Sequence, residues 1–283
     1  MYGAIIGDLA GSQYERHNYL STNFPLLDER SFFTDDTVLT VATAEAMLTD
    51  QDFAAAYRKW AGKYPGRGYG PMFRLWVGNP DMGPYGSVGN GAAMRVSPIP
   101  FLMRGGEVWQ MMKLVRASSE VTHNSPEGEA GAAYLAMTIW FCLHGEDGLG
   151  LWRPLEPVSE LRGKVRGCRA KDTVRAAMSA VNEADGFEQA IRLAVSIGGD
   201  SDTIASMAGA VAEAKWGAPE DLKARAKEYL PDELIELIEI ADKNFQQGVR
   251  LWARSFRRCR RTTRAIRSAV GRSSSPSGRT APS

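Results

Sequence analysis

The sequence predicts an all-α protein, and three observations predict that class. Apolar residues recur at intervals of three and four along successive segments, which is the period of an amphipathic helix. No run of β-branched residues shows the strict alternation of a half-buried strand. Stretches rich in Gly and Pro separate the periodic segments. We therefore expect a compact bundle of roughly ten or more helices, which fills one domain over residues 1–250.

Each expected helix carries an apolar stripe along one face. In the segment 52–64, for example, Phe53, Ala56, Tyr57 and Trp60 lie on the same side of a helix. The segments with such a pattern are 37–48, 52–64, 107–115, 172–184, 187–195, 204–216 and 234–241, and the most apolar segment, 130–143, is expected to be a buried core helix.

Capping residues mark three of the helix starts. Ser125 precedes Pro126, and Asp172 and Asp232 stand at the start of later periodic segments. Two connectors rich in Gly and Pro, 64–91 and 149–167, interrupt the pattern. The first is about 25 residues long, and loops of that length in a compact domain are usually functional or disordered.

Composition excludes several classes of protein. Hydrophobic residues make up 44% and charged residues 24% of the chain, which is the balance of a globular protein. Cys142, Cys168 and Cys259 are too widely spaced for a disulfide framework, which indicates a reducing compartment. The N-terminus has no secretory signal pattern, and the apolar segment 130–143 is too short to span a bilayer. We expect a cytoplasmic protein without membrane contact.

The net charge differs between the body and the C-terminal end. Residues 250–283 contain ten Arg and no acidic residue, whereas residues 1–249 carry a net charge of −9. An acidic body argues against nucleic acid as the main ligand and is compatible with a cation-filled site. Residues 251–283 are expected to form a basic, partly disordered tail. Arg runs can bind nucleic acid, so an acidic partner or nucleic acid at the tail stays an alternative.

Two short motifs place carboxylates in pairs at helix starts. Thr34-Asp35-Asp36-Thr37 precedes one periodic segment, and the Gly-Gly-Asp-Ser-Asp-Thr sequence of 198–203 precedes another. Asp and Thr are favoured caps, and the helix dipole favours negative charge at this end. One cap requires only one such residue, however, and neighbouring carboxylates repel each other. A hard divalent cation, which prefers carboxylate and hydroxyl oxygens, would remove that repulsion.

The N-terminal segment combines small residues with acidic ones. Gly3, Gly7 and Gly11 repeat every four positions, so they share one helix face where another helix can approach closely. Asp8 is harder to place on such an apolar helix. It is either a buried hydrogen-bonding residue or a neighbour of the cations. Glu15 lies just beyond the helix, and composition alone makes it a surface acid.

A Gly-rich stretch from Tyr85 to Gly91 precedes Arg95, and such backbone can present N–H groups to a phosphate. It matches neither the Walker A spacing nor the GxGxxG dinucleotide motif. His123 lies in a polar loop before a helix, and isolated histidines are more often structural than catalytic. Zinc-ligand spacings and the GxSxG motif of serine hydrolases are absent from the sequence.

Taken in order, these segments resemble the ADP-ribosylglycohydrolase family from Tyr2 to about Trp216. The resemblance implies a compact all-α domain, an orthogonal bundle of the ADP-ribosylglycohydrolase type, with a binuclear site for two divalent cations, Mg²⁺ or Mn²⁺. It implies that the metal ligands are Thr34, Asp35, Asp36, Asp200, Asp202 and Thr203. The residues that it places at the substrate are Glu15, Ser87, Gly89, Asn90, Gly91 and His123. Arg95 follows the Gly-rich loop as in the family pattern, and we expect a structural role for it.

The resemblance further implies an ADP-ribosylhydrolase that acts on an ADP-ribosylated protein or another ADP-ribose conjugate. Hydrolysis at a sugar carbon requires an acid and a base, and Glu15, Asp35 and Asp36 are the candidates. ADP-ribosyl-arginine is the leading substrate. The alternatives are O-linked serine-, poly- or O-acetyl-ADP-ribose, or a non-catalytic ADP-ribose-binding module. Tyr69, in the Gly-rich stretch 66–71, is expected to line the entrance and stack on a guanidinium or an adenine, unless this is an ordinary loop.

Overall fold

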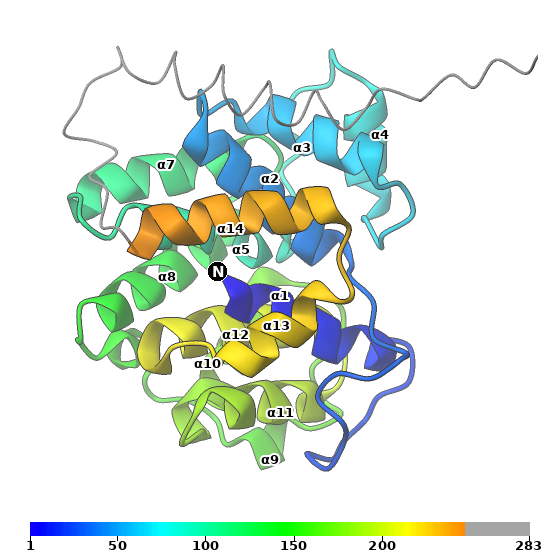
Figure 1. The fold of residues 1–283 in the computed structure, drawn as a ribbon, viewed down its shortest axis with the longest axis vertical. Helices are drawn as coiled ribbons and strands as arrows, with labels where there is room; N and C mark the ends of the chain where they lie inside the picture. Colours follow the sequence, from blue (N-terminus) through cyan, green and yellow to red (C-terminus); the bar gives the residue numbers. More distant parts are fainter. Residues whose placement is uncertain (247–283) are drawn as a thin grey trace, which may run out of the picture.

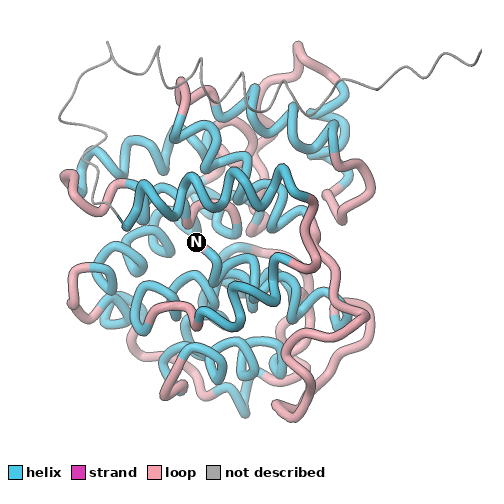
Figure 2. The backbone as a smooth tube through the Cα atoms, in the orientation of Figure 1, coloured by secondary structure: helices cyan, strands magenta, loops and turns pink. Residues whose placement is uncertain are grey.

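The structure is a computed structural model, and it describes residues 1–246 (Figure 1). Over this range the backbone forms helices joined by loops, without a strand (Figure 2). An isolated antiparallel bridge joins Gly89 to Arg169. The all-α class expected from the sequence is confirmed. The predicted domain end at residue 250 and the basic tail, 251–283, lie outside the described residues.

The elements follow the predicted order, and each of the eight expected segments lies in a helix to within one residue at either end. Their bounds are α1 Tyr2–Gly11, η1 Ser12–Tyr14, α2 Asp35–Leu48, α3 Phe53–Lys63, α4 Pro71–Gly78, α5 Gly91–Met94, α6 Pro98–Leu102, α7 Val108–Glu120, α8 Pro126–Leu143, η2 Gly148–Trp152, α9 Val158–Leu161, α10 Ala170–Glu183, α11 Phe187–Ile197, α12 Ser201–Trp216, α13 Glu220–Lys227 and α14 Asp232–Gln246.

Capping chemistry explains where two of these helices begin. The Ser125 hydroxyl caps α8 by accepting a hydrogen bond from the Gly128 N–H at 3.0 Å, as predicted. Helix α10 begins at Ala170, two residues before the predicted start at Asp172. The reason is that the Arg169 carbonyl accepts hydrogen bonds from the N–H groups of Asp172 and Thr173.

The two Gly- and Pro-rich connectors contain helices that the sequence pattern did not reveal. Helix α4 lies inside the connector 64–91, and it starts with Pro71 and buries Phe73 and Trp76 against the core. The second connector, 149–167, contains most of η2 and the short helix α9. The expectation of one continuous loop of about 25 residues is therefore wrong.

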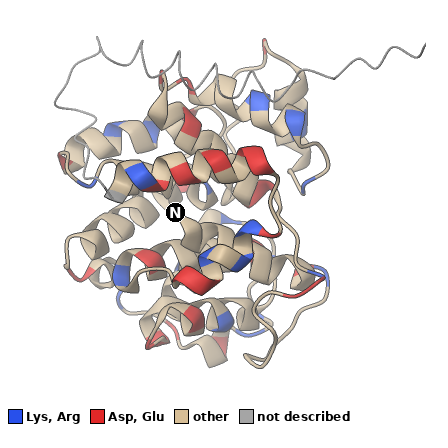
Figure 3. Ribbon diagram, in the orientation of Figure 1, with Lys and Arg blue, Asp and Glu red and all other residues tan. Residues whose placement is uncertain are grey.

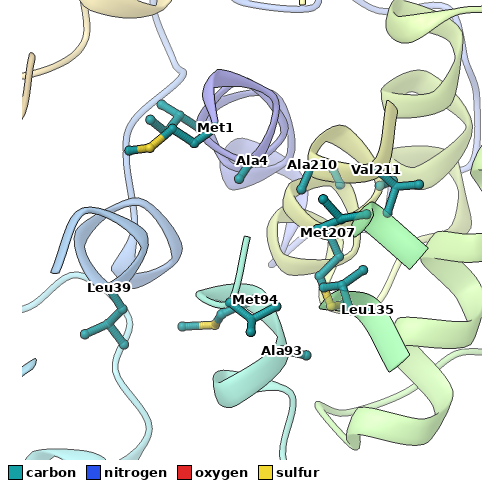
Figure 4. Close-up of a cluster of buried hydrophobic side chains, with 14 of the residues drawn as sticks. Met1, Ala4, Leu39, Ala93, Met94, Leu135, Met207, Ala210 and Val211 are labelled. Carbon is teal, nitrogen blue, oxygen red and sulfur yellow. The ribbon is translucent and has the colours of Figure 1, made fainter. Parts of the chain in front are cut away.

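Helices α1 and α12 lie side by side near the centre of the molecule (Figure 1). Helix α12 also contacts α8, α10 and α11, whereas α2 contacts α1, α3, α6 and α14. Figure 4 shows a cluster of buried hydrophobic side chains to which several of these helices contribute. They include Ala4 of α1, Leu39 of α2, Met94 of α5, Leu135 of α8 and Met207 of α12. This core fixes α1, α2 and α12 relative to one another, because burying each Leu or Met side chain contributes about 1.5–3 kcal/mol.

Helix α14 shows how an outer helix covers this core. Its apolar residues Leu234, Leu237 and Ile238 are buried, whereas Glu236 is exposed. Figure 3 shows acidic residues along the side of this helix that faces the viewer. No helix within residues 1–246 combines the length and the apolar content needed to cross a bilayer.

The glycine stripe of α1 is the contact surface for α12, which confirms the structural role expected for it. A Cβ at Gly7 would lie 2.1 Å from the Ala205 carbonyl oxygen, and one at Gly3 would lie 2.1 Å from the Gly209 carbonyl oxygen. Side chains larger than hydrogen are thus excluded from this interface. The close approach brings Asp8 of α1 into the neighbourhood of Asp202 at the start of α12.

Substituting Gly7 with Ala is expected to lower the free energy of unfolding by about 3 kcal/mol, because the new methyl group must separate two packed backbones. Urea titration of the variant and the wild type would measure the difference. Gly62 is the matched control, since it lies in α3 with no atom within 4 Å of an added Cβ. Gly62→Ala is expected to keep or slightly raise stability. Equal stability of both variants would contradict the tight α1–α12 contact.

Candidate active site

Six acidic residues from four separate segments meet at one place in the fold. They are Asp8 in α1, Glu15 after η1, Asp35 and Asp36 at the start of α2, and Asp200 and Asp202 at the start of α12. In the group Asp8, Asp36 and Asp202, carboxylate oxygens lie within 4.8 Å of one another, and the same holds for Glu15, Asp200 and Asp202. Asp202 belongs to both groups, so the structure joins the two acidic motifs into one cluster.

Asp8 anchors the start of α2. Its carboxylate accepts hydrogen bonds from the backbone N–H and the hydroxyl of Thr34, at 3.0 and 2.7 Å, and from the N–H and the hydroxyl of Thr37. Four donors occupy most of its lone pairs, so Asp8 is a weaker candidate ligand than its neighbours. The first alternative considered for Asp8 is confirmed, because it is a buried hydrogen-bonding residue; its position inside the acidic cluster would also make it a neighbour of any cation bound there.

Asp36 has an unsatisfied oxygen in the interior of the cluster. The residue is 1% exposed, and its Oδ2 accepts a hydrogen bond from the Thr203 hydroxyl at 3.0 Å. Its Oδ1 is buried without a hydrogen-bond partner. Across the cluster, Asp202 is also buried, and its Oδ1 accepts from the Thr203 N–H at 2.8 Å. A buried acceptor without a donor is costly, so the free Asp36 oxygen points to a ligand that completes the site.

The second group of carboxylates is closer to solvent. Glu15 is exposed, and Asp200 is partly exposed. The Asn90 side-chain amide donates a hydrogen bond to Asp200 Oδ2 at 2.7 Å and another to the Thr173 hydroxyl at 3.2 Å. Asn90 therefore connects the Gly-rich loop to the acidic cluster. Its amide holds a carboxylate in place, a role that the sequence did not predict.

The loop before α4 covers the carboxylate of Asp35. The Asp35 N–H donates a hydrogen bond to the Arg67 carbonyl at 2.7 Å, and a Cβ at Gly68 would lie 2.8 Å from Asp35 Oδ1. Tyr69 is 4% exposed, and its ring stacks on Phe73 with the centroids 5.5 Å apart. The expected entrance position of Tyr69 is therefore corrected, because the ring is packed into the protein rather than offered to a ligand.

Burial and mutual repulsion disfavour charge on this cluster. Burial raises the pKa of Asp35 to about 8, with repulsion from Asp8 as the next cause. The same two effects raise the pKa values of Asp36 and Asp202 well above the usual range. Burial, with a smaller effect of Asp200, raises the pKa of Glu15. The folded protein thus favours a proton or another positive charge at these oxygens.

Protein cations do not supply that charge. Within residues 1–246, none of the six carboxylates forms an ion pair with Lys or Arg. Carboxylate and hydroxyl oxygens are the donor set that hard divalent cations prefer. The clustered carboxylates, the Thr hydroxyls and the free Asp36 oxygen therefore fit divalent cations.

The Gly-rich loop lies on His123 beside the cluster. A Cβ at Gly91 would lie 3.0 Å from His123 Nε2, which explains why glycine stands there. Four of the loop N–H groups are already engaged. Gly86 donates to the Asn124 side-chain oxygen at 2.8 Å and Ser87 to the Thr122 carbonyl at 3.3 Å, while Gly89 donates to the Ser87 hydroxyl at 3.2 Å and Asn90 to the Cys168 carbonyl at 2.8 Å. Only the other N–H groups of this loop are therefore candidates to bind a phosphate.

Two residues with a place in this site were not among the predicted site residues. Thr37 completes the hydrogen bonds around Asp8, and Thr122 bonds to the ring of His123 at 2.8 Å. The only signal was position, because Thr37 follows the acidic pair and Thr122 precedes the histidine.

Comparisons with known proteins show which family the chain resembles. A family model described as ADP-ribosylglycohydrolase matches residues 1–254. The ADP-ribosylhydrolase ARH3 of Mus musculus is 27% identical over 305 residues, covering 76% of this chain and 82% of that protein. The ADP-ribosylhydrolase ARH3 of Homo sapiens is 26% identical, covering 82% and 89%.

Two further relatives extend the comparison. The ADP-ribosylarginine hydrolase Tri1 of Pseudomonas putida is 29% identical over 157 residues, covering 50% of this chain and 41% of that protein. A solved structure described as an ADP-ribosylglycohydrolase-related protein complex shares the fold, with a TM-score of 0.66 and 24% identity. That match covers 88% of this chain and 96% of the other.

Proposed function

Because this chain belongs to the ADP-ribosylglycohydrolase family and is therefore a glycohydrolase, we propose that it uses divalent cations to hydrolyse ADP-ribosyl-arginine on protein. The observation that carries the proposal is the junction of two acidic groups at Asp202. At that junction the buried Asp36 Oδ1 has no hydrogen-bond partner, and no Lys or Arg of residues 1–246 pairs with the carboxylates.

The proposed ligands are the carboxylates of the cluster other than Asp8, together with the hydroxyls of the two threonines that bond to it. They are Thr34, Asp35, Asp36, Asp200, Asp202 and Thr203, with Glu15 at the solvent side. Two cations, Mg²⁺ or Mn²⁺, would supply Lewis-acid stabilisation of negative charge at this place. Asp8 holds α2 in register through Thr34 and Thr37, so that Asp35 and Asp36 project toward the start of α12.

The reaction breaks the bond between C1 of the ribose and a nitrogen of the arginine guanidine. The oxygen of a water forms the new bond to C1, one of its protons passes to a base, and a proton moves to the leaving nitrogen. We assign the transfer of these protons first to Glu15, because it is exposed, and second to Asp35, which is partly exposed as a residue although the loop before α4 covers its carboxylate. Asp36 shares the cluster but is buried, so its role is to bind rather than to exchange protons with bulk water.

The substrate side of the site is formed by the Gly-rich loop. Ser87, Gly89 and Gly91 border the cluster where Asn90 bonds to Asp200, and His123 lies beneath them. In the proposed complex, a diphosphate and ribose bound at this loop would lie next to the carboxylates. The match to the protein named ADP-ribosylarginine hydrolase supports arginine as the acceptor.

A panel of arginine-, serine- and acetyl-linked ADP-ribose substrates, assayed with Mg²⁺, with Mn²⁺ and with EDTA, tests the proposal. We expect release of ADP-ribose from the arginine conjugate with either cation, and a loss of at least about a hundredfold with EDTA. Preferential cleavage of an O-linked substrate would overturn the arginine assignment and leave the hydrolase assignment intact. Binding of ADP-ribose without release from any conjugate would identify a binding module instead. Full activity in EDTA would contradict the role of the cations.

A further inference from the structure

A buried guanidinium lies behind the Gly-rich loop without a carboxylate partner. Arg95 follows α5 and is fully buried, and it forms no ion pair within residues 1–246. Its Nε and Nη1 have no hydrogen-bond partner. The guanidinium lies over the Tyr57 ring at 4.0 Å, and its Nη2 donates to the Ser118 carbonyl in the last turn of α7. The ring and the helix end offset part of the cost of burying this charge.

The other partner of Arg95 is a hydroxyl that determines the tautomer of a histidine. Arg95 Nη2 donates to Thr122 Oγ1 at 2.7 Å, and the same oxygen lies 2.8 Å from His123 Nδ1. Thr122 is fully buried, and these are its two side-chain hydrogen bonds within the described chain. Since Arg95 has only protons to donate, the Thr122 proton must go to Nδ1 to avoid a buried unsatisfied donor. The ring proton of a neutral His123 then lies on Nε2.

The Nε2 edge of this ring faces the substrate loop. Nε2 lies 3.0 Å from the position of a Cβ at Gly91 and 3.8 Å from that at Gly89. Burial, with the positive charge of Arg95 as the second cause, lowers the pKa of His123 to about 3. The ring therefore stays neutral under ordinary conditions. Because the N–H groups of Gly89 and Asn90 are engaged elsewhere, a donor from the ring is one of few that remain for a ligand at this loop.

We propose that Arg95 and Thr122 are positioning residues that hold His123 as the Nε2–H tautomer, so that its ring donates a hydrogen bond to an oxygen of ADP-ribose at the Gly-rich loop. The inference rests on the proposed function for the identity of the ligand. The tautomer itself is a property of the free protein. Arg95 touches no ligand in this arrangement, and its effect passes through the Thr122 hydroxyl.

The tautomer is measurable in the full chain by nitrogen–proton correlation spectroscopy on protein labelled at histidine. The chain has three histidines, and His123→Gln identifies the signals of His123 by their loss. The wild type is expected to show the proton on Nε2. Thr122→Val removes the hydroxyl at nearly constant shape, and we expect it to move the proton at least partly to Nδ1. ADP-ribose affinity, measured by calorimetry, should fall about three- to tenfold, the value of one hydrogen bond.

Two further variants separate positioning from packing. Thr122→Ser keeps a hydroxyl at the same place and is expected to restore both the tautomer and the affinity. Thr138→Val is the matched control, because Thr138 is a buried threonine whose hydroxyl accepts from Trp152 and donates to Tyr134, away from His123. It is expected to change neither readout.

The outcomes distinguish the inference from the function on which it rests. A wild-type His123 with its proton on Nδ1, in a protein that binds ADP-ribose, would overturn the positioning role of Arg95 and Thr122 and leave the proposed function intact. An unchanged His123 tautomer and an unchanged ADP-ribose affinity in Thr122→Val would also overturn that positioning role. Failure of the wild type to bind ADP-ribose would count against the proposed function and against the donor role of His123.

Discussion

Asp36→Asn is expected to lower kcat/KM for the arginine conjugate by about a thousandfold or more, the largest effect of any single substitution at this site. Asn has nearly the same shape, but it replaces an anionic oxygen by a neutral amide in the middle of the cluster. The buried Oδ1 has no hydrogen-bond partner among residues 1–246, so replacing it mainly affects the ligand that binds there. The variant should also be at least as stable as the wild type in EDTA, because one repelling charge is gone.

The pairing of lost activity with retained stability is the diagnostic feature of this variant. Thermal unfolding in EDTA and steady-state kinetics with Mn²⁺ would measure the two quantities on the same preparation. Asp52→Asn is the matched control, since Asp52 also stands at a helix start and caps α3 by accepting from the Ala55 N–H at 2.9 Å. Asn caps about as well as Asp, so this control should keep full activity. Activity of Asp36→Asn within a few-fold of wild type would contradict the proposed site.

The fold was predictable from the sequence to the extent that its helices are long. Segments such as 172–184 and 204–216 carry several turns of apolar period, and each lies in a helix. Helix α9 has four residues and α4 has eight, so neither repeats the pattern often enough to be read within Gly- and Pro-rich sequence. The close packing of α1 was predictable from its glycines. Its partner α12 was not predictable, because a face of small residues indicates that a helix can approach closely and does not indicate which helix.

The candidate site was predictable in its chemistry and not in its connections. Acidic pairs at two helix starts indicated cations, and the family resemblance assigned the remaining residues. The contacts that assemble the site join residues far apart in sequence, such as Asp8 with Thr34, Thr203 with Asp36, and Asn90 with Asp200. Their separations are 26, 167 and 110 positions, respectively. The local sequence pattern contains no information about such pairs. The anchoring role of Asp8 and the hydrogen bond from the Asn90 side-chain amide to Asp200 therefore became visible only in the structure.

Divalent cations are expected to raise the thermal stability of the protein, and to raise it more at pH 8 than at pH 5. In the metal-free protein, burial and repulsion raise the pKa of Asp35 to about 8 from a usual value of 3.8. Between these two values the folded chain binds more protons than the unfolded chain. Stability of the metal-free protein therefore falls as the pH rises through this window. A cation competes with those protons for the same oxygens. Its contribution to the free energy of unfolding therefore grows as the pH rises and the carboxyl groups lose their protons.

The expected size follows from mass action. At a free cation concentration of a hundred times Kd, a ligand of the folded state contributes about 2.7 kcal/mol, or a rise in Tm of roughly 5–10 °C for a chain of this size. Scanning calorimetry would measure Tm under four conditions, at pH 5 and at pH 8, each with EDTA and with Mn²⁺. Asp202→Asn removes the residue shared by both acidic groups, so it should lose most of the cation response and flatten the pH dependence in EDTA. A cation response that is equal at both pH values, or that survives in Asp202→Asn, would show that the cations act somewhere other than among these carboxylates.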